Sequence, residues 1–241
     1  MLVSYPDGND ARRRRPPSAP LEGAPPVTPA EGPPRTPITI DRRARNKADK
    51  QHRIFVAAAS LFTGLGYSAV TTQMVADRAD VGTGTLFRYA SSKAELLMMV
   101  LNEQMRLATR EGVLASEAGD SPVDAIMALL APQIHLSLEF PENTAVYQRE
   151  ILFGSERGPY RAEALARISE LENAIADILA RFALVSRVRS GVDLRGAART
   201  MFSTLHMELI RVSLGREDPR ALPGTLRAHV DVLLYGVLAP A

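Results

Sequence analysis

Apolar residues recur every three or four positions along most of the chain beyond residue 53, which is the spacing of amphipathic α-helices. The first such segment predicts a long helix whose apolar side carries Ile54, Ala58, Leu61, Phe62 and Leu65. Gly64 and Gly66 close this pattern, so we expect the helix to end there.

Two short helices follow, joined by a turn that leaves almost no residues between them. Hydroxyls of Thr71 and Thr72 are suited to cap the first of the two helices. Its apolar side carries Val75, Ala76 and Ala79. Asp80 lies where the chain must turn sharply, and aspartate tolerates the left-handed conformation better than most residues. Val81 is expected to fill the corner between the helices.

The second short helix, predicted from Gly82 to Tyr89, projects more side chains than it buries. Leu86 is the one strongly apolar residue on its inner side, while threonine, aromatic and basic side chains occupy the rest. Such a helix pair is the layout of a helix-turn-helix, whose second helix enters the major groove of DNA. The pattern therefore predicts a DNA-reading protein.

A third helix begins at Ser92, where Ser-Lys-Ala-Glu fits a capping box. Ser92 accepts a hydrogen bond from the amide of Glu95, and Glu95 reaches back to Ser92. The amphipathic helix continues through Leu96, Leu97, Val100, Leu101 and Leu107. Beyond Gly119, proline, glycine and capping residues delimit further helices, at about 121–138, 141–153, 159–184, 193–215 and 226–238. The predicted fold class is all-α.

Composition narrows the class of protein further. With 241 residues and 46% hydrophobic content, the chain is large enough for a sizeable core. The absence of cysteine excludes disulfides and thiolate chemistry, and no apolar run is long enough for a membrane span. The four arginines at 12–15 precede a proline-rich stretch rather than an apolar signal core, so we expect a cytoplasmic protein.

Charge and proline are unevenly distributed along the chain. Residues 1–40 hold ten of the seventeen prolines, which predicts a disordered tail. The net charge is +1 over residues 1–40, +5 over 41–93 and −4 over 94–241, so the positive excess coincides with the helix-turn-helix. Phosphate groups would attract that region. A solvated helix face is the alternative interpretation of the basic run from Arg42 to Arg53.

The segment from Arg53 to Leu97 resembles the N-terminal domain of tetracycline-repressor-like (TetR family) regulators. The shared elements are Ala-Ala-x-x-Leu-Phe, Gly-Tyr, Thr-Thr, Val-Ala, Gly-Thr-Leu-Phe and Ser-Lys-x-x-Leu-Leu. The resemblance implies a tail (1–40), a three-helix helix-turn-helix domain (41–92) and a helical domain for effector binding and dimerisation (93–241). Two positions depart from the family pattern: Asp80 replaces the usual glycine, and Ala90 follows Tyr89 where a bulky aromatic is usual.

The resemblance also assigns candidate DNA contacts, which are Thr72, Gln73, Thr83, Gly84, Thr85, Phe87, Arg88, Tyr89 and Lys93. Phosphate oxygens suit Thr72, Tyr89 and Lys93, whereas base edges suit Gln73, Thr83, Thr85 and Arg88. Gly84 permits close approach to DNA. For Phe87, packing in the core is an equal alternative. The basic arms at 12–15 and 42–45 could reach a minor groove, or serve solubility alone.

An apolar effector pocket is implied in the second domain, with candidate residues Met98, Met105, Met127, Phe140, Tyr147, Phe153, Met201, His206 and Met207. Methionine suits adaptable pockets, but it is also ordinary core filler. His135 and His206 are expected to be hydrogen-bonded core or pocket residues, because no cluster stands at metal-ligand spacing. We expect no metal and no cofactor.

The last two helices carry apolar residues on more than one side, as Phe202, Val232 and Tyr235 show. Such helices need a second partner, which the resemblance identifies as the same pair in a second copy; deeper burial within one subunit is the alternative. The leading hypothesis is a homodimeric repressor that binds a palindromic operator and is released by a small, largely apolar effector. The rivals are an enzyme, for which catalytic motifs are lacking, and a binding module whose helix-turn-helix does not read DNA.

Overall fold

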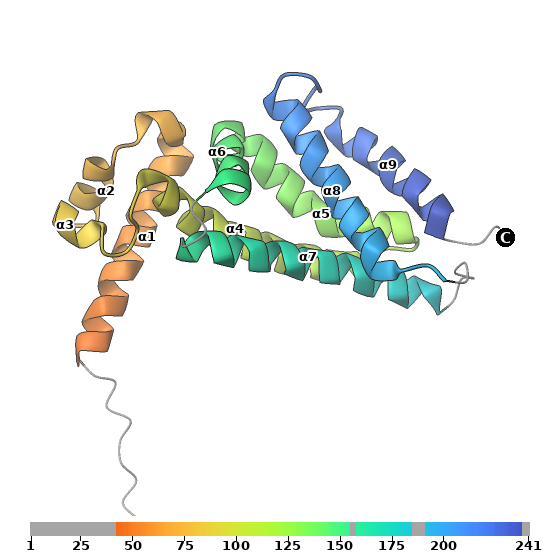
Figure 1. The fold of residues 1–241 in the computed structure, drawn as a ribbon, viewed down its shortest axis with the longest axis horizontal. Coiled ribbons are helices and arrows are strands. Elements are labelled where there is room, and N and C mark those ends of the chain that lie inside the picture. Colours follow the sequence, from red (N-terminus) through yellow and green to blue (C-terminus); the bar gives the residue numbers. More distant parts are fainter. Residues whose placement is uncertain (1–41, 155–157, 185–190, 238–241) are drawn as a thin grey trace, which may run out of the picture. The chain divides into compact units, whose positions relative to one another are not determined.

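The computed structural model describes residues 42–154, 158–184 and 191–237, and within these ranges the chain forms nine α-helices and no strand (Figure 1). The helices are α1 (Arg42–Ala69), α2 (Thr72–Arg78), α3 (Thr83–Leu86), α4 (Lys93–Ser116), α5 (Pro122–Glu139), α6 (Pro141–Phe153), α7 (Pro159–Ala183), α8 (Leu194–Ser213) and α9 (Leu222–Val237). The all-α prediction is confirmed. The predicted tail and its arginine cluster lie outside the described residues.

Two apolar cores hold the helices together. The first joins α1, α2, α3, the first half of α4, the second half of α6 and the start of α7. The second joins α5, α8, α9 and the rest of α7. Long helices α4 and α7 run side by side (Figure 1), and α6 packs against both α1 and α4. The helix-turn-helix and the C-terminal helices therefore share continuous packing.

Side-chain oxygens cap the helices at the residues where the sequence predicts a start, namely Thr71, Ser92, Ser121 and Asp193. The capping box at α4 differs in one detail. Ser92 Oγ accepts from the amide of Glu95 (3.1 Å), but the Glu95 carboxylate accepts from the amide of Ser91 (2.6 Å) instead of Ser92. The first bond satisfies an amide that the first turn of the helix leaves free, and the second holds the residue before the N-cap.

The regular helix of α1 breaks at Gly66, as its glycines predict. Gly64 stays helical, whereas Gly66 has φ 76° and ψ 167°, a non-helical conformation that glycine adopts without strain, and a short helical segment continues to Ala69. Helix α6 holds this end in place. Asn143 Nδ2 donates to the carbonyl of Phe62 (3.0 Å), and the Glu142 carboxylate accepts from the amide of Ser68 (2.8 Å).

Helix α3 is shorter than the predicted 82–89 segment. After Leu86, the amides of Arg88 and Tyr89 bond three residues back, to Thr85 (3.1 Å) and Leu86 (2.9 Å). The last residues of the segment therefore form tight turns and do not continue the α-helix.

At Gly112 the backbone of α4 packs directly against the backbone of α5. A Cβ atom at this position would lie 2.1 Å from the carbonyl oxygen of Leu129. Only glycine fits such a gap, because the neighbouring atom belongs to the main chain and cannot rotate away.

Candidate DNA-binding surface and ligand cavity

The turn between α2 and α3 has the left-handed geometry that the sequence predicts. Asp80 has φ 50°, the single positive value among the non-glycine residues described. Arg53 of α1 fixes this turn, since its Nη1 donates to the Asp80 carbonyl and to the Asp80 carboxylate, both at 3.2 Å. Leu86 anchors the second helix from within, with no exposed surface.

The outer side of the helix pair is accessible over most of the predicted DNA-contacting residues. Gln73, Gly84, Phe87 and Arg88 are exposed, and Thr72, Thr83, Thr85 and Tyr89 are half-buried. Phe87 is 47% exposed, so the alternative of a core position for its ring is wrong. Nothing lies within 4 Å of a Cβ atom built at Gly84, and the fold itself therefore does not require glycine there.

Two predicted phosphate contacts already have partners inside the protein. The Tyr89 hydroxyl donates to the carbonyl of Lys47 in α1 (3.2 Å). Lys93 Nζ donates to the carbonyls of Tyr67 and Val70, each at 2.9 Å, and lies 4.1 Å from the centre of the Tyr67 ring. Lys93 thus ties α4 to the end of α1, where helix carbonyls lack partners of their own.

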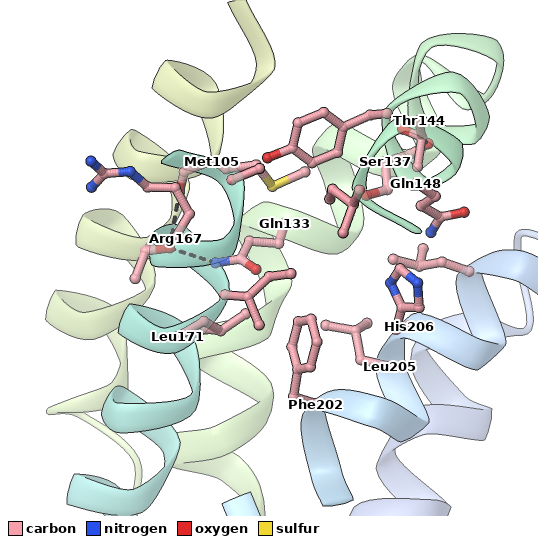
Figure 2. A pocket seen from close by; sticks show the side chains of 16 residues that line it. Met105, Gln133, Ser137, Thr144, Gln148, Arg167, Leu171, Phe202, Leu205 and His206 are labelled. Atoms are coloured by element: carbon pink, nitrogen blue, oxygen red, sulfur yellow. Dashed lines mark hydrogen bonds between the residues drawn. The ribbon is translucent and has the colours of Figure 1, made fainter. Parts of the chain in front are cut away.

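A cavity of about 70 Å³ lies among α4, α5, α6, α7 and α8. Its lining is mostly apolar and includes Ile168, Leu171, Phe202, Leu205 and Leu209. Figure 2 shows side chains from all sides converging on this space, with Phe202, Leu205 and His206 coming from α8. The space accommodates a few non-hydrogen atoms as it stands, so a larger ligand must displace lining side chains.

Of the predicted ligand-binding residues, Met105, Tyr147 and His206 line the cavity. The others lie elsewhere: Met98 and Met201 are buried in the two apolar cores, Met127 packs against the second core, Phe140 lies between α5 and α6, and Phe153 is 82% exposed. Met207 is also largely exposed, at 54%. Residue type alone selected these positions, and it does not reveal which side of a helix faces an interior space.

Sequence reasoning missed the polar residues of the lining. Gln133 and Ser137 of α5 are buried one turn apart, and so are Thr144 and Gln148 of α6. A signal for them exists, because polar residues at i and i+4 on the apolar side of a helix mark a buried polar stripe. Figure 2 shows Ser137, Thr144 and Gln148 on one side of the cavity, with His206 facing them.

The polar atoms of the cavity differ in how far they are satisfied. Gln133 Nε2 donates to Thr109 Oγ1 (2.9 Å), whereas the buried Ser137 hydroxyl has no hydrogen-bond partner. Burial lowers the pKa of His206 below its ordinary 6.5, which favours the neutral imidazole. The guanidinium of Arg167 is paired with the carboxylate of Glu170 (2.7 Å).

Hydrogen bonds connect the cavity wall to the helix-turn-helix. The Tyr147 hydroxyl donates to Asn102 Oδ1 (2.8 Å), and Asn102 Nδ2 donates to the carbonyl of Tyr160 (2.9 Å). The Tyr160 hydroxyl in turn donates to the carbonyl of Tyr89 (3.0 Å), three residues after the end of α3. Burial raises the pKa of the Tyr147 hydroxyl, so this group keeps its proton and acts as a donor.

Large apolar side chains are exposed on the outer sides of α8 and α9. Val232 is 68% exposed and Tyr235 is 73% exposed on α9, and Met207 lies on α8. In the ranges that the structure describes, no single helix is long and apolar enough to span a membrane; only α5 and α6 together meet that test, with a bend of 109° between them.

An exposed polar helix held against a capped, buried one by a left-handed turn defines a helix-turn-helix DNA-binding protein. The model of the bacterial regulatory proteins of the tetR family matches residues 54–99, which span most of α1, both short helices and the start of α4. The chain is similar to this family over its helix-turn-helix segment. It is a DNA-binding transcriptional regulator and not an enzyme.

Known relatives extend this similarity beyond the helix-turn-helix. The transcriptional repressor KstR of Rhodococcus jostii is 27% identical over 194 residues, which cover 80% of this chain and 87% of the relative. KstR of Mycobacterium tuberculosis is 28% identical over 133 residues, covering 55% and 58% respectively. The crystal structure of FadR from Thermus thermophilus, a TetR family repressor in complex with lauroyl-CoA, has the same fold, with a TM-score of 0.62, 24% identity and coverage of 79% and 96%.

Proposed function

We propose that this regulator is a repressor that leaves its operator when a small molecule occupies the cavity among α4–α8. The observation that carries the proposal is the presence of both parts in one packed unit: an exposed helix pair of the size that enters a DNA groove, and a largely apolar cavity. Its relatives named above are repressors, which agrees with this direction of control.

The proposed division of the chain follows the two roles. Residues 41–92 read DNA, and residues 93–241 bind the effector and the second subunit. Arg88, Thr85, Thr83 and Gln73 contact base edges, and Thr72 contacts phosphate. Tyr89 and Lys93 have the additional task of holding the helix pair on α1 and α4. We place the protein in the cytoplasm, where its operator lies.

A homodimer is the proposed form of the protein on DNA. One short recognition helix reads only a few base pairs, whereas two helices related by a two-fold axis read a palindrome. The exposed apolar residues of α8 and α9 support this pairing, because Val232, Tyr235 and Met207 would leave water on contact with the same surface of a second copy.

The proposed effector has a largely apolar body and one uncharged polar end. Most of the cavity lining is apolar, and the unpartnered hydroxyl of Ser137 offers a hydrogen bond beside Gln148. Among the described lining residues, the charge of the Arg167 guanidinium is already balanced by glutamate, and burial favours neutral His206. A ketone or hydroxyl oxygen fits these donors better than a charged group does.

Release requires that the effector prefer the conformation that does not bind DNA. A coupling of this kind typically changes affinity by roughly 5- to 150-fold. A ligand that binds both conformations equally would leave the operator occupied, however tight its binding.

Selection of duplexes from a fragmented-genome library tests the proposed function. The wild-type protein should enrich a palindrome, and the double variant Arg88→Ala with Thr85→Ala should lose or blur it. Arg110→Ala, which removes an exposed cation from α4 outside the helix pair, is the matched control and should enrich the same sequence. Failure of the wild-type protein to enrich any sequence would contradict the proposal.

The effector class is tested with three probes that share one alkyl chain: lauryl alcohol, lauric acid and lauroyl-CoA. We add a 3-ketosteroid to represent a rigid apolar body with an uncharged oxygen. Titration calorimetry should rank the uncharged probes above lauric acid, and Ser137→Ala should weaken them selectively. Preference for lauric acid or lauroyl-CoA would contradict the uncharged end and leave the repressor assignment standing.

A further inference from the structure

Asn102 lies where the cavity wall meets helix α7. Helix α7 in turn contacts the recognition segment, by which we mean residues 82–89. Asn102 lies on α4 with no exposed surface, and both ends of its amide are used. Its oxygen accepts from the hydroxyl of Tyr147, which lines the cavity. Its nitrogen donates to the carbonyl of Tyr160 and, at 3.2 Å, to the carboxylate of Glu163. Three helices therefore share one buried amide.

Tyr160 continues the connection toward DNA. Its hydroxyl donates to the carbonyl of Tyr89 (3.0 Å) and lies 3.3 Å from the sulfur of Met99. Tyr89 lies three residues after the end of α3, and its own hydroxyl donates to the carbonyl of Lys47 in the N-terminal part of α1. A displacement of the first turn of α7 therefore acts directly on the residue that ends the recognition segment.

We propose that Asn102 is the positioning residue that transmits occupation of the cavity from Tyr147 through Tyr160 to the recognition segment at Tyr89. The inference rests on the proposed function, because it describes how that regulator is controlled. A ligand too large for the 70 Å³ cavity displaces the Tyr147 ring. The buried Asn102 oxygen then loses its donor, which is costly unless α4 or α7 moves to restore a partner.

The packing around these residues explains why the movement does not stay local. Tyr147 is 5% exposed and belongs to the first apolar core together with Met99, Leu96 and Leu86. Close-packed interiors respond to an added volume by shifting whole elements, since they contain little empty space. Asn102 links that shift to one hydrogen bond on the recognition segment.

A double-mutant cycle on the full-length protein tests this proposal without an effector. Tyr147→Phe and Tyr160→Phe each remove one hydroxyl of the connection and keep the ring. The first readout is hydrogen exchange of the backbone amides at 86–92, with amides of α9 as an internal reference for global stability. We expect both variants to speed exchange at 86–92 by at least threefold relative to α9, and the double variant to add little.

The matched control is Ser169→Ala, which removes an exposed hydroxyl from α7 outside the connection and should leave exchange at 86–92 unchanged. Asn102→Asp tests the centre of the connection, because it keeps an acceptor for Tyr147 but replaces the donor to Tyr160 with a carboxylate. It should match Tyr160→Phe. Equal changes at 86–92 and in α9, or independent effects of the two hydroxyls, would overturn the proposal.

The second readout is affinity for the duplex enriched by the wild-type protein. The effects of Tyr147→Phe and Tyr160→Phe on affinity should depart from additivity by at least threefold, whereas either substitution combined with Ser169→Ala should be additive. If no duplex is enriched, the repressor function fails, while the exchange data still decide whether Asn102 connects the cavity to the recognition segment.

Discussion

Arg53 donates hydrogen bonds to both the carbonyl and the carboxylate of Asp80, with one nitrogen of its guanidinium 3.2 Å from each oxygen. The contact spans from α1 to the turn of the helix-turn-helix. It accounts for an aspartate at a position where the TetR family usually has glycine: the side chain adds an anchor, and the backbone still reaches φ 50°.

The turn predicts a clear order of stability among substitutions at Asp80. Asp80→Ala removes the carboxylate part of the anchor and puts in the left-handed region a residue that tolerates it less well than aspartate, so we expect a loss of about 1 to 2 kcal/mol. Asp80→Gly removes the anchor but relieves the backbone, and should lie within about 0.5 kcal/mol of wild type, because the carboxylate is 97% exposed. Urea unfolding checks the order; equal losses for both substitutions would contradict it.

Lys93 is predicted to matter for folding even in the absence of DNA. Lys93→Met keeps the apolar stem but deprives the carbonyls of Tyr67 and Val70 of their charged donor, which should cost about 2 kcal/mol. Thermal unfolding of the free protein measures this loss. Lys50→Met, at an exposed position of α1, is the control and should be nearly neutral. Wild-type stability of the Lys93→Met protein would contradict the structural role of Lys93 and leave only its proposed contact with phosphate.

His206 predicts a pH dependence of stability on the acidic side of neutrality. Because burial lowers its folded-state pKa below 6.5, its contribution is complete above about pH 6.5 and is lost as the pH falls through the folded-state pKa. His206→Gln should flatten this part of the curve of unfolding free energy against pH. His135→Gln, which alters an exposed histidine on α5, should leave the curve as in wild type. A slope unchanged by His206→Gln would contradict the assignment.

The exposed apolar residues of α8 and α9 predict where the interface of the proposed dimer lies. Val232→Arg places a charge at a site 68% exposed in the single chain and should shift the protein from dimer to monomer in sedimentation velocity. Leu114→Arg makes the same kind of change at a site 69% exposed on α4 and should leave the dimer intact. A monomeric wild-type protein, or an equal effect of both substitutions, would locate the interface elsewhere.

The helix-turn-helix could be predicted almost completely from sequence, because its determinants are local. The caps at Thr71 and Ser92, the left-handed Asp80 and the buried Leu86 each follow from a few neighbouring residues. Even here, the end of α3 was misjudged, since the turns after Leu86 depend on contacts with α1 and α7.

The cavity was harder to predict, because it is formed by five helices whose relative rotation no single segment encodes. Apolar periodicity does not separate Met105, which faces the cavity, from Met98, which faces the core two turns away. The polar pair Gln133 and Ser137 was the better signal, since burial of polar atoms has to serve a purpose. The connection through Asn102 joins residues more than 40 positions apart and required the structure.

Gly112 is the point about which α4 would tilt, because there the backbones of α4 and α5 meet without a side chain between them. From that point to Lys93 the helix runs for roughly 28 Å, so a tilt of about 5° displaces its DNA-proximal end by roughly 2.5 Å. That displacement approaches the 3.4 Å spacing of successive nucleotides along a strand. A pivot at Gly112 would therefore convert a small tilt of α4 into a shift of roughly three quarters of one nucleotide spacing at the DNA-binding end.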